Sequence, residues 1–507
     1  MRPNFWDVYR DPIMGRDTAV ATILSIHWNL CMGTIGTYAH QRPDLAPLLA
    51  KLVRFDLCGE FMLTEIGHGL DARNLETKAT LQPDGSFDLH TPNAAAAKAM
   101  PPTTPWAGIG RVGVVFARLI VQEEDRGIKA FIVHLNDEKE MCPGITSQPL
   151  PKRSGAKALD HAITTFTHVR LGPEALLGSP AQARDQRADF MRQIYRVPIG
   201  TLSLSTTHIP VIQQSVLIAG TYSLRRHIAA ESNNQSTPII QFSTQYRPIL
   251  DAFVQSLAYD AFAEEAIAVY TNTKLSGEIR SAVAVCFKAS VSPDAQITLT
   301  ELADRCGWQG LFEYNKIVEV AMAIRGNGIA EGDYTVLCIR LVSEVLLGRY
   351  ELPEAKMKSC QLARHEAGVW QEARDAVASL LGKEHRGAEF NAHLLPRCRD
   401  LVRATGHRMA YEAAAANDKI QPAALKLFES ICIKSDLSWY CQYEGLNRTA
   451  FLAQDATAAK EVLPLMEAFL RQDKPPGVAI APIMYEESWN EFVRDLPEFR
   501  ASKTACP

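Results

Sequence analysis

One run of the sequence gathers polar side chains around two glycines: Thr64-Glu65-Ile66-Gly67-His68-Gly69-Leu70-Asp71, continued by Ala72-Arg73-Asn74-Leu75-Glu76-Thr77. The residues just before it, Phe61-Met62-Leu63, are apolar and predict a strand that ends where the polar run begins. Gly67 and Gly69 have no Cβ, so the backbone there can come close to a flat ligand. The run therefore predicts a ligand site.

The acidic and basic side chains of this run need not act together. Glu65 and His68 are three residues apart, and on a strand this spacing sends them to opposite faces. We therefore expect no shared acid–base chemistry from the pair and a structural role for His68.

The composition is that of an ordinary globular protein. The chain has 507 residues, of which 47% are hydrophobic and 22% charged, enough for several domains with buried cores. With a net charge of −4 and no evident basic patch, nucleic acid is not expected as a partner. The eleven cysteines form no C-x-x-C pair, which predicts reduced thiols, no disulfide framework and no metal site.

Neither end of the sequence resembles a targeting signal. The first residues, Met1-Arg2-Pro3-Asn4-Phe5-Trp6-Asp7, lack the layout of a signal peptide, and we expect no apolar run of membrane-spanning length. The last residues, Ala505-Cys506-Pro507, differ from the peroxisomal S-K-L signal. The expectation is therefore no membrane span and, by default, a cytoplasmic location.

The texture of the sequence changes twice along the chain, and this predicts an α+β fold. Apolar spacing is helical in residues 1–56, short strands separated by turn residues follow, and the rest is helical again. The expected strands are 87–90, 112–121, 129–135 and 162–171; the expected later helices are 211–228, 246–270, 318–323 and 336–347; the expected breaks are Pro293, Pro353 and Pro475-Pro476-Gly477. We divide the chain into an N-terminal helical domain (1–56), a central β domain (57–180) and two C-terminal helical domains (181–350 and 351–507).

A glycine-rich segment imitates a dinucleotide-binding motif. Gly108-Ile109-Gly110-Arg111-Val112-Gly113 matches G-x-G-x-x-G, which binds dinucleotides when a strand precedes it and a helix follows. Here a proline-rich segment precedes it, and Val112 to Phe116 predict a strand. We therefore reject a Rossmann site and keep a glycine turn at a strand start as one alternative.

The opening run resembles the flavin-facing motif of the acyl-CoA oxidases, a branch of the acyl-CoA dehydrogenase superfamily. The resemblance covers nearly the whole chain. Three more segments resemble that family: Leu159-Asp160-His161-Ala162; Tyr222-Ser223-Leu224-Arg225-Arg226 followed by Gln241 and Gln245; and Arg305-Cys306-Gly307-Trp308, which leads to Ala330-Glu331-Gly332-Asp333. The resemblance implies a partial N-terminal helical segment, a central β-barrel-like domain and C-terminal helical bundles.

The same resemblance implies FAD as cofactor and a homodimer as the assembly. The residues that would hold FAD are Thr64, Gly67, Gly108, Gly110, Arg225, Arg226, Gln241, Gln245 and Gly307. Either arginine would serve the pyrophosphate, because a guanidinium group matches phosphate oxygens in pairs. The alternative for both arginines is a solvated helix face.

Two Glu-Gly dipeptides compete for the role of catalytic base. Glu331 follows a segment like the family's C-G-G, whereas Glu444, in Tyr443-Glu444-Gly445, has no glycine-rich segment before it. The separation between Thr64 and Glu331 also leaves room for a β domain and one helical bundle. We favour Glu331 as the base, and the alternative is an acid that merely begins a helix.

The implied reaction is the α,β-dehydrogenation of an acyl-CoA or related thioester to a trans-2-enoyl thioester, as in fatty acid β-oxidation. O2 would be the electron acceptor and H2O2 the product, and by family analogy a peroxisomal location stays open. Three departures from the family are an early Thr64, which implies a shortened N-terminal domain, and two bulky residues in its motifs, Trp308 and Tyr334. If these aromatic residues line the acyl tunnel, they would favour a specialised, polyketide-like substrate. A flavin oxidase or monooxygenase acting on a non-CoA substrate and a catalytically degenerate flavoprotein subunit are the alternatives.

Overall fold

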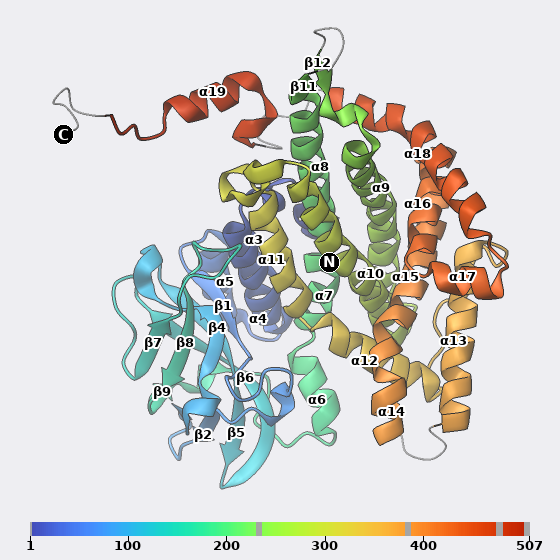
Figure 1. The fold of residues 1–507 in the computed structure, drawn as a ribbon. Coiled ribbons are helices and arrows are strands. Elements are labelled where there is room, and N and C mark those ends of the chain that lie inside the picture. The colour runs from blue at the N-terminus through green and yellow to red at the C-terminus, as the bar shows by residue number, and fades with distance from the viewer. Residues whose placement is uncertain (1–2, 230–235, 381–386, 473–479, 501–507) are drawn as a thin grey trace.

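A small group of N-terminal helices lies between a strand-rich part and a long helical part, although along the chain the strands come second (Figure 1). The computed structural model describes residues 3–229, 236–380, 387–472 and 480–500. The expected break at Pro475-Pro476-Gly477 lies outside these residues.

The N-terminal helices include one long helix with a π-helical middle. The helices are α1 (Pro3–Arg10), α2 (Ile13–Arg16), α3 (Thr18–Leu24), the π-helical segment η1 (Ser25–Met32), α4 (Gly33–Tyr38) and α5 (Ala46–Val53). Asp17 starts α3, since its side chain accepts hydrogen bonds from the backbone N–H groups of Ala19 and Val20. Segments α3, η1 and α4 run on as a continuous helix, Thr18–Tyr38.

This helix corrects the expectation that no apolar run in the sequence reaches membrane-spanning length. Thr18–Tyr38 is long and apolar enough, by length and composition, to cross a membrane. In the structure, however, η1 packs against strand β1 and helix α7, and its polar residues His27 and Asn29 are buried and hydrogen bonded. We therefore interpret the stretch as a helix of the protein core.

The strands form two main sheets. They are β1 (Cys58–Met62), β2 (Lys78–Leu81), β3 (Phe87–His90), β4 (Lys98–Pro102), β5 (Arg111–Val121), β6 (Glu124–Asn136), β7 (Ile145–Pro149), β8 (His161–Phe166), β9 (Val169–Leu171), β10 (Leu176–Leu177), β11 (His227–Ala229) and β12 (Ser236–Pro238). The larger sheet has the order β10-β6-β5-β2-β3-β9, with β1 parallel to the first half of β5. The smaller sheet has the order β4-β8-β7, and β11 pairs with β12. The expected strand 162–171 is divided, because His168 adopts a left-handed turn conformation (φ 50°) between β8 and β9.

The larger sheet buries both faces. Along β5, Val112, Val114 and Phe116 face the N-terminal helices, while the alternate residues Val115 and Ala117 pack towards the smaller sheet. This alternation makes β5 buried along most of its length. It also excludes a helix after Gly110, so the rejection of a Rossmann site is confirmed.

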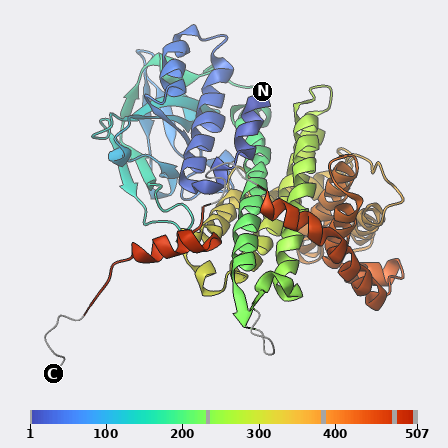
Figure 2. The ribbon, with the colours of Figure 1, turned by 90° about the horizontal axis from the view of Figure 1, so that it is seen from above.

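The C-terminal part is helical. Its helices are α6 (Gln186–Gln193), α7 (Arg196–Thr206), α8 (His208–Arg225), α9 (Ser243–Thr271), α10 (Gly277–Asp304), α11 (Ile317–Ile329), α12 (Tyr334–Leu346), α13 (Gln361–Leu380), α14 (Ala388–His393), α15 (Cys398–Ala415), α16 (Pro422–Lys434), α17 (Leu437–Tyr443), α18 (Arg448–Arg471) and α19 (Glu486–Arg494). Helix α19 extends away from the body (Figures 1 and 2). The expected break at Pro293 is wrong, because Pro293 lies inside α10. Tertiary packing of α10 against α7, α9, α11 and α15 outweighs the cost of a proline in a helix, about 3 kcal/mol.

Candidate functional site

The polar run forms a loop that follows β1 and is held from inside. Thr64 lies just after the strand, and its carbonyl accepts a hydrogen bond from the backbone N–H of Ala99 at 3.0 Å. The buried carboxylate of Glu65 accepts from Lys98 Nζ at 3.0 Å and from the Thr77 hydroxyl at 2.6 Å. Burial lowers the pKa of Lys98 to about 8, against the opposing effect of Glu65. The Glu65–Lys98 pair thus pins the loop that presents Thr64.

His68 takes no part in this buried pair. Its Nε2 lies 2.9 Å from Glu76 Oε1, at the rim of the loop. Both residues bond to Glu76, but through different groups, since Glu65 accepts from the Glu76 backbone N–H at 2.7 Å and His68 meets the Glu76 carboxylate.

The glycines of the two flavin-like motifs differ in what surrounds them. A Cβ on Gly67 would come within 2.8 Å of Ala95 Cβ, and one on Gly110 within 3.0 Å of Leu57 Cδ2, so protein packing accounts for both glycines. Gly108 has a left-handed backbone (φ 64°) and open space where a Cβ would stand. Of the two glycines for which a close approach was predicted, Gly69 has open space at its Cβ position and Gly67 does not; the roles of Gly67 and Gly108 in binding FAD stay predictions.

Large apolar side chains are exposed beside these motifs. Trp106 is 73% exposed and directly precedes the Ala107-Gly108 turn, while Leu70 and Ile66 in the opening run are 68% and 54% exposed. Large apolar side chains left exposed can mark a place that a ligand or partner covers. A flat aromatic ligand such as a flavin fits this combination of an exposed indole and an open glycine. Sequence reasoning missed Trp106, although a tryptophan in a proline–glycine turn was a usable signal.

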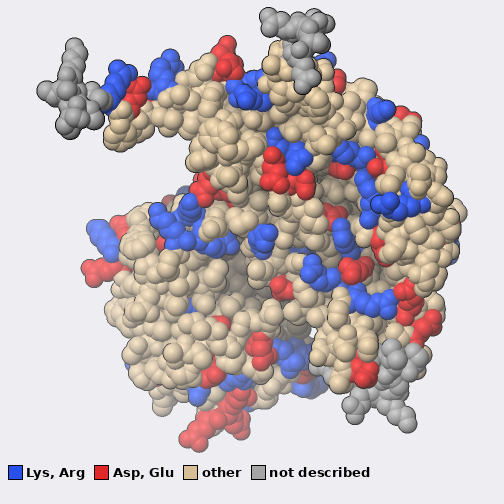
Figure 3. All heavy atoms as spheres, in the orientation of Figure 1, with Lys and Arg blue, Asp and Glu red and all other residues tan. Residues whose placement is uncertain are grey.

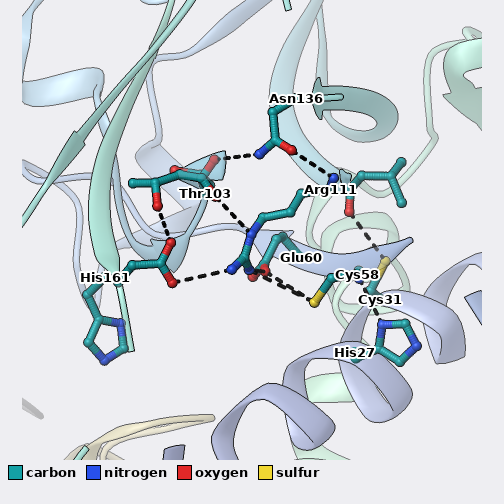
Figure 4. A network of polar contacts seen from close by, with 12 residues as sticks. His27, Cys31, Cys58, Glu60, Thr103, Arg111, Asn136 and His161 are labelled. Atoms are coloured by element: carbon teal, nitrogen blue, oxygen red, sulfur yellow. Dashed lines mark hydrogen bonds and ion pairs between the residues drawn. The ribbon is translucent and has the colours of Figure 1, made fainter. Parts of the chain in front are cut away.

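A buried ion network fixes the turn that carries Trp106. Arg111, which is 1% exposed, donates to Glu60 Oε1 at 2.5 Å and to Asp160 Oδ1 at 3.3 Å. Its Nε donates to the Thr104 carbonyl at 3.2 Å, and the Thr104 hydroxyl donates to Asp160. Figure 4 shows this network between β1 and β5, with His27 and Cys31 of η1 approaching it from the helical side. Asp160, in a segment that the sequence singled out, therefore has a structural partner.

The residues predicted to bind the FAD pyrophosphate lie elsewhere, where α8 ends beside the paired strands β11 and β12 (Figure 1). Arg225 donates to the Ile483 carbonyl at 3.1 Å and to Glu486 Oε2 at 2.5 Å, so its donors serve the C-terminal segment. Arg226 and Gln241 are exposed. Gln245 donates to the Arg305 carbonyl at 2.6 Å, which brings it to the segment that begins at Gly307.

The predicted residues thus form two groups in one chain. Thr64, Gly67, Gly108 and Gly110 belong to the β part, whereas Arg225, Arg226, Gln241, Gln245 and Gly307 belong to the far end of the helical part (Figure 1). Gly307 has a left-handed backbone (φ 59°) and open space at its Cβ position.

Glu331 lies in a strained turn between α11 and α12. Its backbone is left-handed (φ 52°), which costs free energy in any residue other than glycine, and Gly332 follows with φ 95°. Its carboxyl group packs directly on helix α7, where a Cβ on Gly200 would overlap Glu331 Oε2. On the opposite side Asn29 Nδ2 donates to the same oxygen at 2.9 Å. The turn therefore points a carboxyl group into the junction of η1 and α7.

A buried lysine holds this turn. Lys288 of α10 is fully buried and donates to the carbonyls of Ala330 and Gly332, each at 2.7 Å. These two carbonyls flank Glu331, so the lysine stabilises the backbone that presents it. Burial lowers the pKa of Lys288 to about 8, with Glu331 acting in the opposite direction.

Burial also changes the proton affinity of the predicted base. It raises the pKa of the Glu331 carboxyl to about 8, and Lys288, Asn29 and Arg196 oppose the rise. A carboxylate whose pKa lies near the working pH is a strong enough base to take a proton from carbon. It is also ionised often enough at that pH to act as a base.

Glu444 has a different environment. It accepts from Arg364 at 2.7 Å at the end of α17 and is part of an ordinary ion pair. Because Arg364 already holds the Glu444 carboxylate, the arrangement favours Glu331 over Glu444.

The two bulky departures from the family motifs are not placed together. Trp308 is 61% exposed and packs against Trp489 of α19, with ring centroids 6.3 Å apart. Tyr334 lies beneath the Arg399 guanidinium, 4.7 Å from the ring centroid. The suggestion that Trp308 lines an internal acyl tunnel is therefore wrong.

Four residues around Glu331 were missed by sequence reasoning: Asn29, Arg196, Gly200 and Lys288. Lys288 is a single charge in the otherwise apolar or small run Ala282-Val283-Ala284-Val285-Cys286-Phe287-Lys288-Ala289-Ser290. Asn29 likewise interrupts an apolar helix. A lone polar residue on a buried helix must find a polar partner, and this was the available signal.

Among the described residues, no three His, Cys, Asp or Glu side chains are grouped so that they could hold a metal ion. The ten cysteines described in the structure are free thiols.

Comparison with known proteins gives a consistent picture. The family model for the acyl-CoA oxidase C-alpha1 domain matches residues 200–346. The human peroxisomal acyl-coenzyme A oxidase 3 is 25% identical over 363 residues, which cover 66% of this chain and 51% of that protein. The chain spans about half the length of the curated relatives it matches.

The solved structures share the fold at lower identity. Acyl-CoA oxidase 3 from Yarrowia lipolytica superposes with a TM-score of 0.81 at 20% identity, covering 97% of this chain and 81% of that one. Acyl-CoA oxidase-2 from Caenorhabditis elegans, solved with FAD, ascaroside-CoA and ATP, has a TM-score of 0.79 at 17% identity and covers 94% and 80% of the two chains.

N-terminal helices, a curled β part and C-terminal helical bundles, in this order, make an acyl-CoA oxidase-like fold of the α+β class, as the sequence predicts. The likeness to acyl-CoA oxidases is found in the sequence as well as in the fold. The chain is therefore a distant homologue of the acyl-CoA oxidases.

Proposed function

We propose that the protein is an FAD-dependent acyl-CoA oxidase that converts an acyl-CoA or related thioester to the trans-2-enoyl thioester. The observation that carries this proposal is the buried carboxyl group of Glu331, poised in a strained turn whose flanking carbonyls are clamped by Lys288. The Caenorhabditis elegans protein with the same fold was solved with FAD and an acyl-CoA derivative, which supports the cofactor and the substrate class.

The chain's own residues supply alignment and proton transfer. The Glu331 carboxylate takes the proton from the carbon next to the thioester carbonyl, while Asn29 and Lys288 keep the carboxylate and its backbone in place. The turn with Trp106 and Gly108 and the loop with Thr64 present the surface for the isoalloxazine ring. When bound, FAD supplies the redox chemistry by accepting the hydride from Cβ.

In this proposal the second group of predicted residues, at the far end of the helical part, binds the part of FAD that carries the pyrophosphate. Of the two arginines, Arg226 is the better candidate for the pyrophosphate, because Arg225 is already paired with Glu486. Since the two groups lie at different ends of the chain, we propose a homodimer in which a second copy completes the site. Figure 3 shows basic and acidic side chains mixed on one face of the molecule, so substrate recognition is assigned to local contacts rather than to a broad charged surface.

The electron acceptor and the compartment are part of the proposal. We propose O2 as acceptor, with H2O2 as product, and a cytoplasmic location; the human relative is named as a peroxisomal protein.

One assay tests the activity. Purified protein with bound flavin is given a chain-length series of acyl-CoA thioesters in air with no added acceptor. Peroxide release that depends on the thioester supports an oxidase. Turnover only with an added electron acceptor would make the protein a dehydrogenase, and no turnover with any thioester would remove the proposal.

A further inference from the structure

The side chain of Asn29 is oriented without ambiguity. Arg196 Nη2 donates to Asn29 Oδ1 at 2.7 Å, and Arg196 Nε donates to the Asn29 carbonyl at 2.8 Å. Because a guanidinium group can only donate, the amide oxygen of Asn29 must face Arg196. The amide nitrogen must then face Glu331 Oε2, at 2.9 Å. The carboxyl group therefore receives a hydrogen bond from a donor that cannot turn away.

Arg196 is itself held in place. It is buried at the start of α7, and its guanidinium lies 5.6 Å from the ring centroid of Phe5. Gly33 leaves the room that it needs, since a Cβ there would overlap the guanidinium nitrogens. The pair Arg196–Asn29 is thus a prepared support and does not depend on a flexible surface side chain.

In the π-helical segment η1, the polar residues His27 and Asn29 contact different parts of the structure. His27 Nδ1 accepts from the backbone N–H of Gly59 in β1 at 2.8 Å, and Asn29 reaches α7 and Glu331. π-Helical segments inside α-helices often occur at functional sites. One turn of helix therefore contacts both the strand that leads to Thr64 and the predicted base.

We infer that Asn29, held by Arg196, is a positioning residue that fixes the Glu331 carboxyl group in one orientation and stabilises its ionised form. The inference rests on the proposed function of Glu331. Besides Asn29, the charged or titratable groups near Glu331 are Arg196, Lys288 and Tyr9, with Asp333 on its own turn. A hydrogen bond donated to the charged form favours that form, so losing Asn29 makes ionisation of Glu331 harder.

Two variants of Asn29 and one control separate this role from a purely structural one. Asn29→Leu removes the donor, and the nearly isosteric Asn29→Asp keeps an oxygen for Arg196 but replaces the donor with an acceptor. Thr34→Val is the matched control, because Thr34 is buried in the same long helix and its hydroxyl donates to the Leu30 carbonyl at 2.6 Å, within its own helix. The pH profile of kcat/KM is measured for each on the flavin-loaded enzyme.

We expect the acidic limb of the profile to move up by about one pH unit in Asn29→Leu, which is roughly a tenfold loss below the limb, with recovery at high pH. Asn29→Asp moves it further, and Thr34→Val leaves it unchanged. A loss of equal size at every pH, or the same shift in Thr34→Val, overturns the inference.

A second readout does not use turnover. Unfolding stability is measured for the wild type, Asn29→Leu, Glu331→Gln and the double variant, which together give the coupling between the two residues. We expect coupling at high pH, where Glu331 is ionised, and its loss at low pH. Absent coupling at both pH values contradicts the inference. If instead Glu331→Gln keeps full turnover while the coupling is present, the proposed function fails and the Asn29–Glu331 contact stands.

Discussion

Asn29 and Glu331 are 302 residues apart in the sequence, yet the Asn29 amide donates a hydrogen bond to the Glu331 carboxyl group. The contact joins the N-terminal helix to the turn between α11 and α12. Through His27, the same helix also contacts β1, from which the Thr64 loop continues. The predicted base and the predicted flavin loop are thus tied to one helical segment, and this arrangement leads to the following predictions.

Gly200→Ala should disable the protein without unfolding it. An alanine suits the interior of α7 better than glycine, but its Cβ would overlap Glu331 Oε2 and displace the carboxyl group. Misplacing a catalytic group by about 1 Å can cost on the order of 100-fold in rate, and we expect a loss of that size in steady-state turnover. Gly36→Ala is the control, because Gly36 is in α4 with open space around its Cβ position. Normal turnover in Gly200→Ala would show that the carboxyl position is not important.

Lys288→Met should change the pH profile of turnover by the proposed enzyme. The variant removes the donor shared by the Ala330 and Gly332 carbonyls and the positive charge that favours ionised Glu331. We expect the acidic limb of kcat/KM to move to higher pH. Lys274→Met, at an exposed lysine, should leave the profile unchanged. An unshifted limb in Lys288→Met would argue against the clamp.

The stability of the wild type should fall with rising pH relative to Glu331→Gln. The pKa of Glu331 is raised from 4.5 to about 8, so between these values the folded state holds a proton that the unfolded state has released. This contribution is fully present below pH 4.5 and is lost as pH rises towards 8. Denaturant unfolding at several pH values should show that the free energy of unfolding of Glu331→Gln rises relative to the wild type by a few kcal/mol over this range. A difference that does not vary with pH would mean that Glu331 titrates normally.

Trp106→Ala should weaken FAD binding while the fold stays intact. Because the indole is 73% exposed, its removal should change the free energy of unfolding of the flavin-free protein by no more than about 0.5 kcal/mol. We expect an FAD dissociation constant about tenfold higher, measured by flavin fluorescence, since the indole offers a large apolar surface to the ring. Phe499→Ala, at an aromatic residue that is 98% exposed far along the chain, is the control. Equal FAD affinity in wild type and Trp106→Ala would exclude this surface.

Local patterns of the sequence were enough to predict the α+β class and the strands that became β3, β5, β6, β8 and β9, but not β2, β4 or β7. Period-2 alternation in β5 and β6 and the turn residues between strands are local signals. Tertiary packing in the β part agrees with them. The continuous helix through Pro293 was not predictable in this way, because tertiary packing of α10 overrides the local cost of proline.

The surroundings of Glu331 depend on contacts that no local pattern encodes. Glu331 was recognised by its Glu-Gly motif, but Asn29, Arg196 and Lys288 come from three other helices. Arg225 shows the opposite case, since its motif was visible and its partner Glu486, 261 residues later, was not.

The central claim is that Glu331 is the base of a flavin-dependent dehydrogenation. The most direct test is the absorption spectrum of the FAD-loaded protein, recorded without oxygen before and after addition of acyl-CoA thioesters of different chain lengths. We predict that the flavin absorbance of the wild type bleaches, and that Glu331→Gln keeps the flavin spectrum but does not bleach. Bleaching of Glu331→Gln at the wild-type rate, or a wild type that no thioester bleaches, would contradict the account.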